Sequence, residues 1–487
     1  MIIRNKIFVA LLTLPLLWEM GLLSVSALPS DLAQSSLPET SGEPQAGEKN
    51  TSAAASKDAN DVSLRLDLEN RSIIFSALKL KVAGKNFSTD KEETVSVPLC
   101  QPKTVASEKI VFEKDIHGNL SSILSNCHAN RFVPIAVPGM IVPGSINLKT
   151  ISAEKSPTAS DCDVNESIGL ITLKSNSIQP TANIEANYSV QQARVDTVVI
   201  KSDGTLALLE GTAVNWAPQP PAVPADAYPL LNVYSSSARP LVASDIVPIQ
   251  SQDAYKSVPA KLIQNKTALA SFLNKAKAGG PLKIKFWGDS VTLGSGSTSD
   301  SAMFTNRVIS GLTQMYPKCQ TKGVNLGTGG ANSIVRYKQF SKEVLSDNPD
   351  LVIVEFVNDM LLPVQMLKPV YEKVIDQAKE VGADVLICAP HLPLESFIPV
   401  KNESGVGSGP YRQFIRSLTR ERQGEIAVID VSGWSEGLPK MGLKAESFLV
   451  DGIHPSDAGH AVYADLILRS LSAQAQPAQS QTSTKLR

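Results

Sequence analysis

The sequence predicts an α/β domain in the C-terminal part of the chain and an all-β region before it. From residue 282 onward, short apolar runs alternate with segments whose apolar residues recur at helical spacing. This alternation is typical of parallel strands joined by helices that cover both faces of a sheet. Before about residue 255, strand-like runs are separated by glycine and proline turns, and no helical period stands out. Five strands in the second part favour a flavodoxin-like three-layer domain with a parallel five-stranded sheet.

The length and composition of the chain are those of a protein with two or three globular domains. At 487 residues the chain is too long for one typical domain. Its formal net charge of −1 gives no sign of a nucleic-acid-binding surface, so no nucleic-acid partner is expected. We divide the chain into a signal peptide (1–27), a disordered linker (28–60), a β-rich accessory region (61–245), the α/β domain (250–473) and a disordered tail (474–487).

The first 27 residues have the pattern of a signal peptide. Arg4 and Lys6 form a basic start, the apolar run 7–17 follows, and Val25-Ser26-Ala27 is a small-residue cleavage site. The alternative is a short membrane anchor, but the apolar run falls short of the roughly 18 residues that span a bilayer. We therefore expect an exported protein, secreted, periplasmic or at the cell surface, with no integral membrane segment after cleavage.

None of the five cysteines lies in a metal-binding spacing. Export permits disulfides, and Cys100 could pair with Cys127, but connectivity cannot be deduced from spacing. Cys388 lies inside the apolar run 384–390 and is expected to be a buried thiol. The remaining cysteines are Cys162 and Cys319.

The N-terminal part, from Val62 to about residue 255, is expected to be all-β and to fold as a sandwich-like domain. Apolar and polar residues alternate from Val62 to Leu68, which is the period of a half-buried strand. Further strand-like runs follow at 109–112, 132–137 and 168–173. Residues 28–60 have almost no large apolar side chains and cannot offset the entropy of ordering.

Residues 194–234 form a separate β unit in the sequence. Two apolar runs flank Ser202-Asp203-Gly204, which is a hairpin signal, and a proline-rich arm at 218–224 follows. This stretch resembles a small β module of phage tail and baseplate-type proteins. The resemblance implies an accessory binding or assembly module, with a surface or glycan ligand for the β-rich region. The alternative is a plain hairpin followed by a polyproline spacer.

The α/β part begins with helical spacing from 254 to 278, which Gly279-Gly280-Pro281 ends. Strands are predicted at 282–287, 322–326, 351–357, 384–389 and 425–431. Helices are predicted at about 301–316, 333–346, 366–381, 410–422 and 456–471.

Four polar motifs follow or interrupt these elements. Gly288-Asp289-Ser290 comes directly after the first strand, where open α/β sheets place their ligands. A glycine-rich turn runs from Asn325 to Asn332, and Asn358-Asp359 ends a buried strand. Asp451-Gly452-Ile453-His454 precedes the last helix. A serine becomes a nucleophile when a histidine accepts its proton, and an aspartate three residues before that histidine can hold its second nitrogen.

In this order the four motifs resemble the SGNH (GDSL-type) hydrolase family over residues 280–472. The resemblance implies Ser290, Asp451 and His454 as catalytic residues. It also implies an oxyanion hole made by the backbone N–H groups of Ser290 and Gly330 and the side chain of Asn358. Gly330 is chosen among three glycines by its spacing from Asn325. The chain departs from the family pattern at Phe356, where the family has glycine.

Three of these motifs also have a plainer interpretation. Asp-x-x-His alone is usually a helix start with a surface histidine, Asn358 could cap a strand end, and Gly330 could be an ordinary turn glycine.

Three more polar residues could line the site. They are Asp289, which could also be a capping group, His391, which follows a strand, and Glu355, which lies within an apolar strand. Glu355 is either paired in the core or points into the site with a raised pKa. His460 is expected to be packed or at the surface. No metal or nucleotide motif is found, so no cofactor is predicted.

The signal peptide and the resemblance to the SGNH family together predict a secreted serine esterase. By analogy with that family, the expected substrate is an acylated carbohydrate or other ester, with O-deacetylation as the specific hypothesis. Within enzymes, the alternative is a lipase or lysophospholipase. Outside enzymes, the alternatives are a surface binding or adhesion protein with a degenerate hydrolase domain, and a structural surface protein in which the β region acts.

Overall fold

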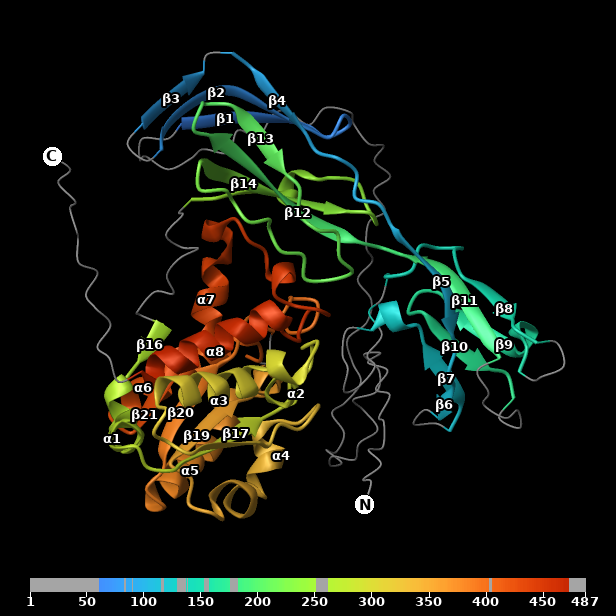
Figure 1. Ribbon diagram of the computed structural model, residues 1–487. Helices are drawn as coiled ribbons and strands as arrows, with labels where there is room; N and C mark the ends of the chain where they lie inside the picture. The colour runs from blue at the N-terminus through green and yellow to red at the C-terminus, as the bar shows by residue number, and fades with distance from the viewer. Residues whose placement is uncertain are drawn as a thin grey trace, which may run out of the picture. The chain divides into compact units, whose positions relative to one another are not determined.

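The computed structural model describes residues 61–82, 85–89, 91–114, 118–128, 137, 139–152, 157–175, 183–250, 262–402 and 405–472 (Figure 1). The predicted signal peptide, linker and tail lie outside these residues, as does nearly all of the predicted strand at 132–137. The described residues form two compact units, one from Asp61 to Val97 and one from Pro98 to Ser472.

The first unit is a four-stranded antiparallel sheet. Its strands are β1 (Asp61–Asp67), β2 (Ser72–Val82), β3 (Lys85–Thr89) and β4 (Glu93–Ser96). The long strand β2 pairs with β1 on one side and with β3 and β4 in succession on the other. Ile73, Phe75 and Val95 are buried. The alternating strand expected from Val62 is confirmed.

The second unit begins with two small antiparallel sheets that share one core. One sheet contains β5 (Lys103–Lys109), β11 (Ile184–Val190) and β8 (Asn147–Thr150), and the other contains β6 (Glu113–Lys114), β7 (Leu120–Ile123), β10 (Leu170–Leu173) and β9 (Cys162–Asn165). Both contribute to one cluster of buried side chains, as a sandwich does. The strand predicted at 109–112 is wrong in its bounds, because Ile110 leaves the ladder and enters this core.

A third antiparallel sheet contains the predicted hairpin. Strands β12 (Ala193–Lys201) and β13 (Leu206–Leu209) flank the turn, with Ile200 opposite Leu206. Strand β14 (Ala227–Ser236) pairs with the other side of β12, and β15 (Ile246–Pro248) pairs with β14. The proline-rich arm connects β13 to β14. The hairpin is confirmed, whereas the resemblance to a phage-type module stays a prediction.

The C-terminal domain is built on a sheet in the order β16-β21-β20-β19-β17-β18. Five strands are parallel: β17 (Leu282–Gly288), β18 (Thr321–Asn325), β19 (Leu351–Glu355), β20 (Asp384–Ala389) and β21 (Ile426–Asp430). In chain order this is the flavodoxin-like sequence 2-1-3-4-5, whose switch point lies between β17 and β19. A two-residue strand, β16 (Ile263–Gln264), adds an antiparallel edge, so the sheet is mixed.

The helices form the two outer layers. Helices α3 (Phe304–Met315) and α8 (Asp457–Leu471) pack side by side on one face, and α4 (Ser333–Tyr337), α5 (Val364–Glu380) and α6 (Ser408–Glu421) follow one another on the other (Figure 1). The described part of the first predicted helix is shorter than expected, because α1 (Ala270–Ala278) starts only after β16 and a 3₁₀ turn. The helix predicted at 333–346 is interrupted after Tyr337 and continues as a π-helical turn at Ser341–Leu345. Helix α7 (Val431–Gly437) was not predicted.

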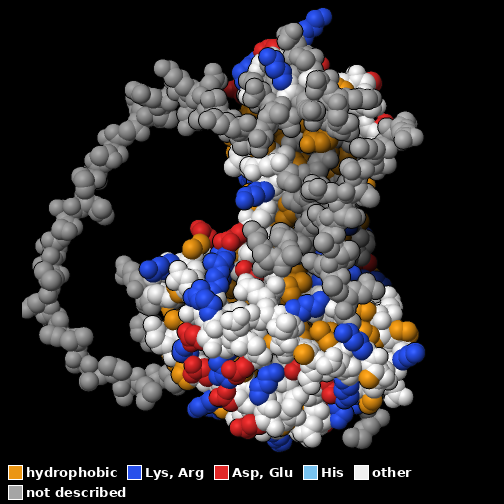
Figure 2. Space-filling model, turned by 90° about the vertical axis from the view of Figure 1, so that its left-hand side faces the viewer, with side chains coloured by type: hydrophobic (Ala, Val, Ile, Leu, Met, Phe, Trp, Pro, Cys, Tyr) orange, Lys and Arg blue, Asp and Glu red, His pale blue; other side chains and the backbone are white. Residues whose placement is uncertain are grey.

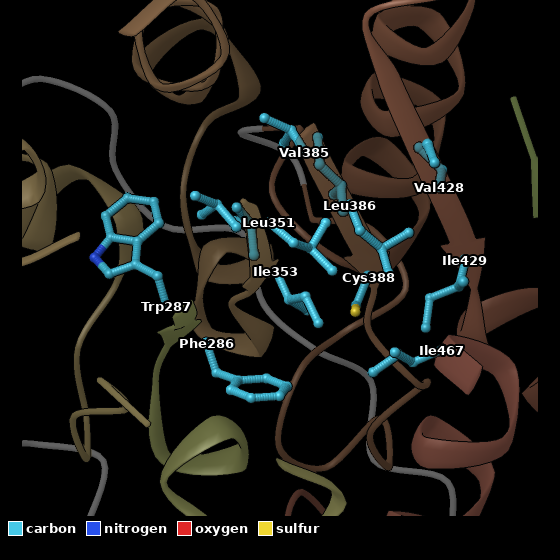
Figure 3. Close-up of a cluster of buried hydrophobic side chains, with 14 of the residues drawn as sticks. Phe286, Trp287, Leu351, Ile353, Val385, Leu386, Cys388, Val428, Ile429 and Ile467 are labelled. Carbon is cyan, nitrogen blue, oxygen red and sulfur yellow. The ribbon is translucent and has the colours of Figure 1, made fainter. Parts of the chain in front are cut away.

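The core of this domain fixes the strand that leads to Ser290. Phe286, Ile353 and Leu386 are neighbours across β17, β19 and β20, and the side chain of Phe286 points to the same side of the sheet as Ile467 of α8 (Figure 3). Trp287 points the other way and makes edge contacts with Phe340 and Phe356 at centroid distances of 4.8 and 4.7 Å. Because β17 is buried on both faces, its end is held firmly in the sheet.

The face of the molecule drawn in Figure 2 is mixed in charge. On this face, Lys and Arg side chains are interspersed with Asp and Glu side chains, in keeping with the formal net charge of −1.

Candidate active site

The turn after β17 presents Ser290 at the first position of the short helix α2 (Ser290–Leu293). The carboxylate of Asp289 caps this helix by accepting the N–H of Val291 at 3.0 Å. The N–H of Ser290 is therefore one of the helix-start donors without a partner inside the helix. Gly288 is needed for the tight turn, because a Cβ there would lie 2.1 Å from the carbonyl oxygen of Glu355.

The structure brings the side chains of Ser290, His454 and Asp451 into one hydrogen-bonded chain. The Nε2 atom of His454 lies 2.9 Å from Oγ of Ser290. On the other side of the ring, Nδ1 lies 2.6 Å from Oδ2 of Asp451. Ser290 and His454 expose 7% and 5% of their surface, so these hydrogen-bonded side chains are almost fully shielded from solvent. Ser290 follows β17, whereas the other two precede α8, and the fold joins residues 164 positions apart.

Asp451 and His454 lie at the tip of a tight loop, which we call the acid–base loop (448–456). At its base the carbonyl of Phe448 accepts the N–H of Ser456 at 2.8 Å, and Val450 donates its N–H to the carbonyl of His454 at 2.9 Å. Gly452 has a φ of +91°, which the turn requires.

The carboxylate of Asp451 is ionised and fixed in orientation. Its Oδ1 accepts the backbone N–H groups of Ile453 and His454 at 3.1 and 2.8 Å. Burial alone would raise the pKa of Asp451, but the His454 ring and these hydrogen bonds lower it below its usual range.

The other residues expected to donate to an oxyanion lie on the turns that follow β18 and β19. Asn358 follows β19, the strand next to β17, and its backbone N–H donates to Oδ2 of Asp289 at 2.9 Å. Its side-chain amide donates one hydrogen to the carbonyl of Ala331 at 2.9 Å, which leaves the second hydrogen of that amide for a ligand. Gly330, at φ +71°, is exposed on the adjoining turn. Asp289 therefore links the turn of Ser290 to Asn358.

Phe356, which stands where the SGNH family has glycine, does not disturb the backbone of this turn. Phe356 has a φ of −140°, an ordinary extended conformation, and its side chain is buried against Trp287.

The two carboxylates expected to line the site are buried beneath it. Asp289 and Glu355 are almost completely inaccessible, and burial raises the pKa of Asp289 to about 7. Burial, with the neighbouring Asp289, raises the pKa of Glu355 well above its usual value. Its Oε2 accepts the hydroxyl of Thr292 at 2.8 Å. Glu355 therefore lies in the core, and its pKa is raised there.

A third carboxylate, Asp359, lies in the same buried layer. It accepts the N–H of Ser333 and the hydroxyl of Tyr371, both at 2.9 Å, and burial raises its pKa to about 6.

His391 supports the acid–base loop and is buried rather than open to a ligand. Its Nε2 lies 2.7 Å from the carbonyl oxygen of Ile453, and its Nδ1 lies 2.9 Å from the hydroxyl of Tyr463. A carbonyl only accepts, so Nε2 carries the hydrogen. Burial lowers the pKa of His391 to about 4, so the ring is neutral at pH 7 and Nδ1 accepts the tyrosine hydroxyl. His391 thereby anchors the residue next to His454.

His460 supports the turn of Ser290 from below, as His391 supports the acid–base loop. This role was not predicted from the sequence. Its Nε2 donates to the carbonyl of Ser295 at 3.1 Å, and its Nδ1 accepts the N–H of Phe304 at 3.4 Å. Burial lowers its pKa to about 4. The available signal was its spacing of three and seven residues from the buried Tyr463 and Ile467 on α8.

The described ranges contain neither a candidate metal-binding cluster nor a membrane-spanning helix. Within those ranges, no three His, Cys, Asp or Glu side chains are grouped so as to hold a metal ion. Nor does any helix in the same ranges combine the length and apolar character needed to cross a bilayer. Cys127 is a free thiol, so the pairing considered with Cys100 does not occur, and Cys388 is buried as expected.

Residues 286–462 match the model of the GDSL-like lipase/acylhydrolase family. This part of the chain is therefore a GDSL-like acylhydrolase domain, an esterase domain by family. The resemblance predicted from the four motifs is confirmed for these residues.

Solved structures with similarity to this chain include esterases and an acylhydrolase. A two-domain esterase active on acetylated mannans is 21% identical, with 46% of this chain and 61% of that chain covered and a TM-score of 0.36. A lipase/acylhydrolase from Enterococcus faecalis is 20% identical over 40% of this chain and 100% of that chain, with a TM-score of 0.32. An acetylxylan esterase from Geobacillus stearothermophilus is 17% identical over 40% and 95%, with a TM-score of 0.33.

The match to the mannan esterase spans less than two thirds of that protein's length. No curated protein sequence matches the chain. The assignment to the family rests on residues 286–462.

Proposed function

We propose that the protein is an exported serine esterase in which Ser290 is the nucleophile, His454 the general base and Asp451 its carboxylate partner. The observation that carries this proposal is the chain of hydrogen bonds from Ser290 Oγ through His454 to Asp451, at 2.9 and 2.6 Å. A nucleophile, a base within hydrogen-bond reach and a group that orients the base are the minimal set for acyl transfer.

In the acylation step Oγ of Ser290 attacks the ester carbonyl while its proton passes to Nε2 of His454. Asp451 holds the hydrogen on Nδ1 and stabilises the imidazolium that forms. The N–H groups of Ser290 and Gly330 and the amide of Asn358 donate to the oxyanion. The tetrahedral intermediate then collapses, the C–O bond to the alcohol breaks, and His454 gives its proton to the leaving oxygen. In deacylation, water attacks the acyl-serine by the same route, and the acid and free Ser290 are released.

A short acyl group is the substrate feature that the site favours. The reacting carbonyl has to reach a serine and a histidine that are both almost buried, which suits an acetyl group better than a long chain. Together with export and the β-rich region, this supports O-deacetylation of a carbohydrate or polysaccharide.

One observation favours a second candidate, a lipase or lysophospholipase. Phe397 and Val400 expose 42% and 51% of their surface, and the ring of Phe397 lies against Gly452 in the acid–base loop. An apolar surface beside the histidine could receive a longer acyl chain.

Acetate release from acetylated oligosaccharides, beside hydrolysis of p-nitrophenyl esters from acetate to dodecanoate, tests both candidates. We expect activity that is highest with acetyl groups and absent in Ser290→Ala and His454→Ala. Ser301→Ala removes an exposed hydroxyl close in sequence and serves as the matched control. Faster hydrolysis of esters with long acyl chains would contradict deacetylation and favour the lipase candidate. Retention of activity in Ser290→Ala would overturn the assigned nucleophile.

Export is a separate part of the proposal. Expression of the full chain in a secreting host should yield a mature N-terminus directly after Ala27, as read by N-terminal sequencing. Protein that stays in the cytoplasm with residues 1–27 attached would contradict it.

A further inference from the structure

The segment that leads into the acid–base loop is hydrogen-bonded to the third β-sheet. The hydroxyl of Tyr234, on β14, accepts the backbone N–H of Lys444 at 2.8 Å. The same hydroxyl also forms a hydrogen bond with Oγ of Ser447 at 2.9 Å, in which either oxygen can be the donor. Tyr234 and Ser447 are both buried. We refer to Tyr234, Lys444 and Ser447 together as the clamp.

A second row of contacts lies beside the clamp. The side-chain amide of Asn232 donates to the carbonyl of Gly442 at 2.9 Å, and the hydroxyl of Thr197 fixes that amide by donating to its oxygen at 2.7 Å. Gly442 has a φ of +72°, and a Cβ there would lie 2.4 Å from the side chain of Ile249. The two segments therefore approach too closely for any residue but glycine at this position.

A buried carboxylate joins the same surfaces electrostatically. Asp245 is fully buried and lies 3.0 Å from Nζ of Lys444, while Arg239 donates to both of its oxygens. Burial alone would raise the pKa of Asp245, but the hydrogen bonds from Arg239 and Lys444 hold it below its usual value. If the sheet separated from the 438–447 segment, the carboxylate of Asp245 would lose its ion pair with Lys444. The energetic cost of that loss opposes separation.

The clamp is continuous with the base of the acid–base loop. Ser447 immediately precedes Phe448, whose carbonyl accepts the N–H of Ser456 and closes the loop. A displacement of Ser447 would therefore be passed to both strands of the loop that carries Asp451 and His454.

We propose that the sheet β13-β12-β14-β15 positions the acid–base loop, and that Tyr234 is the positioning residue through which it acts. Under this proposal the sheet is part of the hydrolase rather than a separable binding module. The proposal rests on the esterase function for its activity readout, but its structural readout is independent of that function.

The test compares Tyr234→Phe with Tyr228→Phe in the full-length protein. The first change removes the hydroxyl that contacts Lys444 and Ser447. The second removes a tyrosine hydroxyl earlier in the same strand, at the position paired with Ile200. A buried donor left without its partner should speed hydrogen exchange in residues 443–456 about tenfold to a hundredfold in Tyr234→Phe. We expect kcat to fall by a similar factor with KM within twofold of wild type, and Tyr228→Phe to match wild type.

Ser447→Ala removes the hydroxyl on the other side of the clamp. It should also speed hydrogen exchange in residues 443–456 and lower kcat. Agreement between the two variants excludes a folding defect that only one of them has. Unchanged exchange in folded Tyr234→Phe would overturn the clamp. Faster exchange with unchanged kcat would overturn its role in catalysis, and equal effects in Tyr228→Phe would overturn its specificity. If wild type hydrolyses no ester, the esterase proposal fails, while the exchange rates still decide the clamp.

Discussion

Replacement of Asp451 by asparagine should disable His454 without removing a hydrogen-bonding side chain. In the wild type, Oδ1 accepts two backbone N–H groups, from Ile453 and His454, and Oδ2 faces Nδ1 of the ring. The two backbone N–H groups can only donate, so they require an oxygen at the Oδ1 position. The asparagine therefore places its amide oxygen at that position and its NH₂ group toward Nδ1 of His454. Nδ1 then has to accept, and the ring hydrogen moves to Nε2.

The consequence is a histidine in the wrong tautomer. A ring protonated at Nε2 donates to Ser290 and cannot take its proton. Loss of the correct tautomer in a serine triad lowers kcat by about 10⁴. That factor corresponds to roughly 5.5 kcal/mol of transition-state stabilisation. KM should change little, because the carboxylate does not contact the substrate.

The assay is steady-state hydrolysis of p-nitrophenyl acetate by wild type, Asp451→Asn and Asp465→Asn. Asp465 lies on α8 and forms a surface ion pair with Arg469 at 2.7 Å, so its variant controls for the loss of a nearby charge. Thermal unfolding verifies that each variant is folded. A folded Asp451→Asn enzyme that keeps more than a tenth of wild-type kcat would refute the tautomer argument.

Three further predictions concern the surroundings of the triad. Asn358→Ala should lower kcat by about 10²–10³ with KM nearly unchanged, because it removes one oxyanion donor; an equal rise in KM would point to ground-state binding instead. Burial lowers the pKa of His460 to about 4, so the unfolded chain binds its proton first as pH falls below about 6.5. The wild type should therefore lose up to about 3 kcal/mol from this residue between pH 6.5 and 4, and urea unfolding of His460→Gln should lack that part of the loss. Gly296→Ala places a Cβ 2.2 Å from the carbonyl of Pro455 at a φ of +88°, and calorimetry should show a destabilisation of at least about 2 kcal/mol. An unchanged melting temperature would contradict that contact.

The parallel sheet could be predicted from the sequence because its strands are buried on both faces. Such strands appear as continuous apolar runs, and the run at 351–357 became β19 within two residues. The polar motifs that follow β17 and β19 then fall at the switch point of the sheet, which is where an open α/β fold gathers its functional residues.

Two other features, strand β16 and the break in the helix predicted at 333–346, carry no local signal. The two residues of β16 are a strand only because they pair with Ile429 and Val428 of β21, and the surrounding sequence has helical spacing. The interruption after Tyr337 occurs without glycine or proline. Helix α7 did have a signal, since Asp430 caps it by accepting the N–H of Gly433 at 2.7 Å.

The types and order of the proposed catalytic residues were predictable, but their supports were not. Motifs indicated Ser290, Asp451 and His454, because acyl transfer needs those groups. The functions of His391 and His460 depend on which carbonyl each ring meets, and the clamp joins Tyr234 to residues 210 and 213 positions away. Contacts of this kind depend on the folded chain and leave no periodic pattern in the sequence.

The measurement that tests the central claim most directly is labelling of the purified protein with a fluorophosphonate, followed by mass mapping of the modified peptide. An activated serine displaces fluoride and becomes phosphonylated, whatever the natural substrate is. We predict a single modification at Ser290 in wild type and none at that position in Ser290→Ala or His454→Ala. Folded wild-type protein that takes no label, or takes it at another serine, would contradict the proposal that Ser290, His454 and Asp451 act together as a catalytic unit.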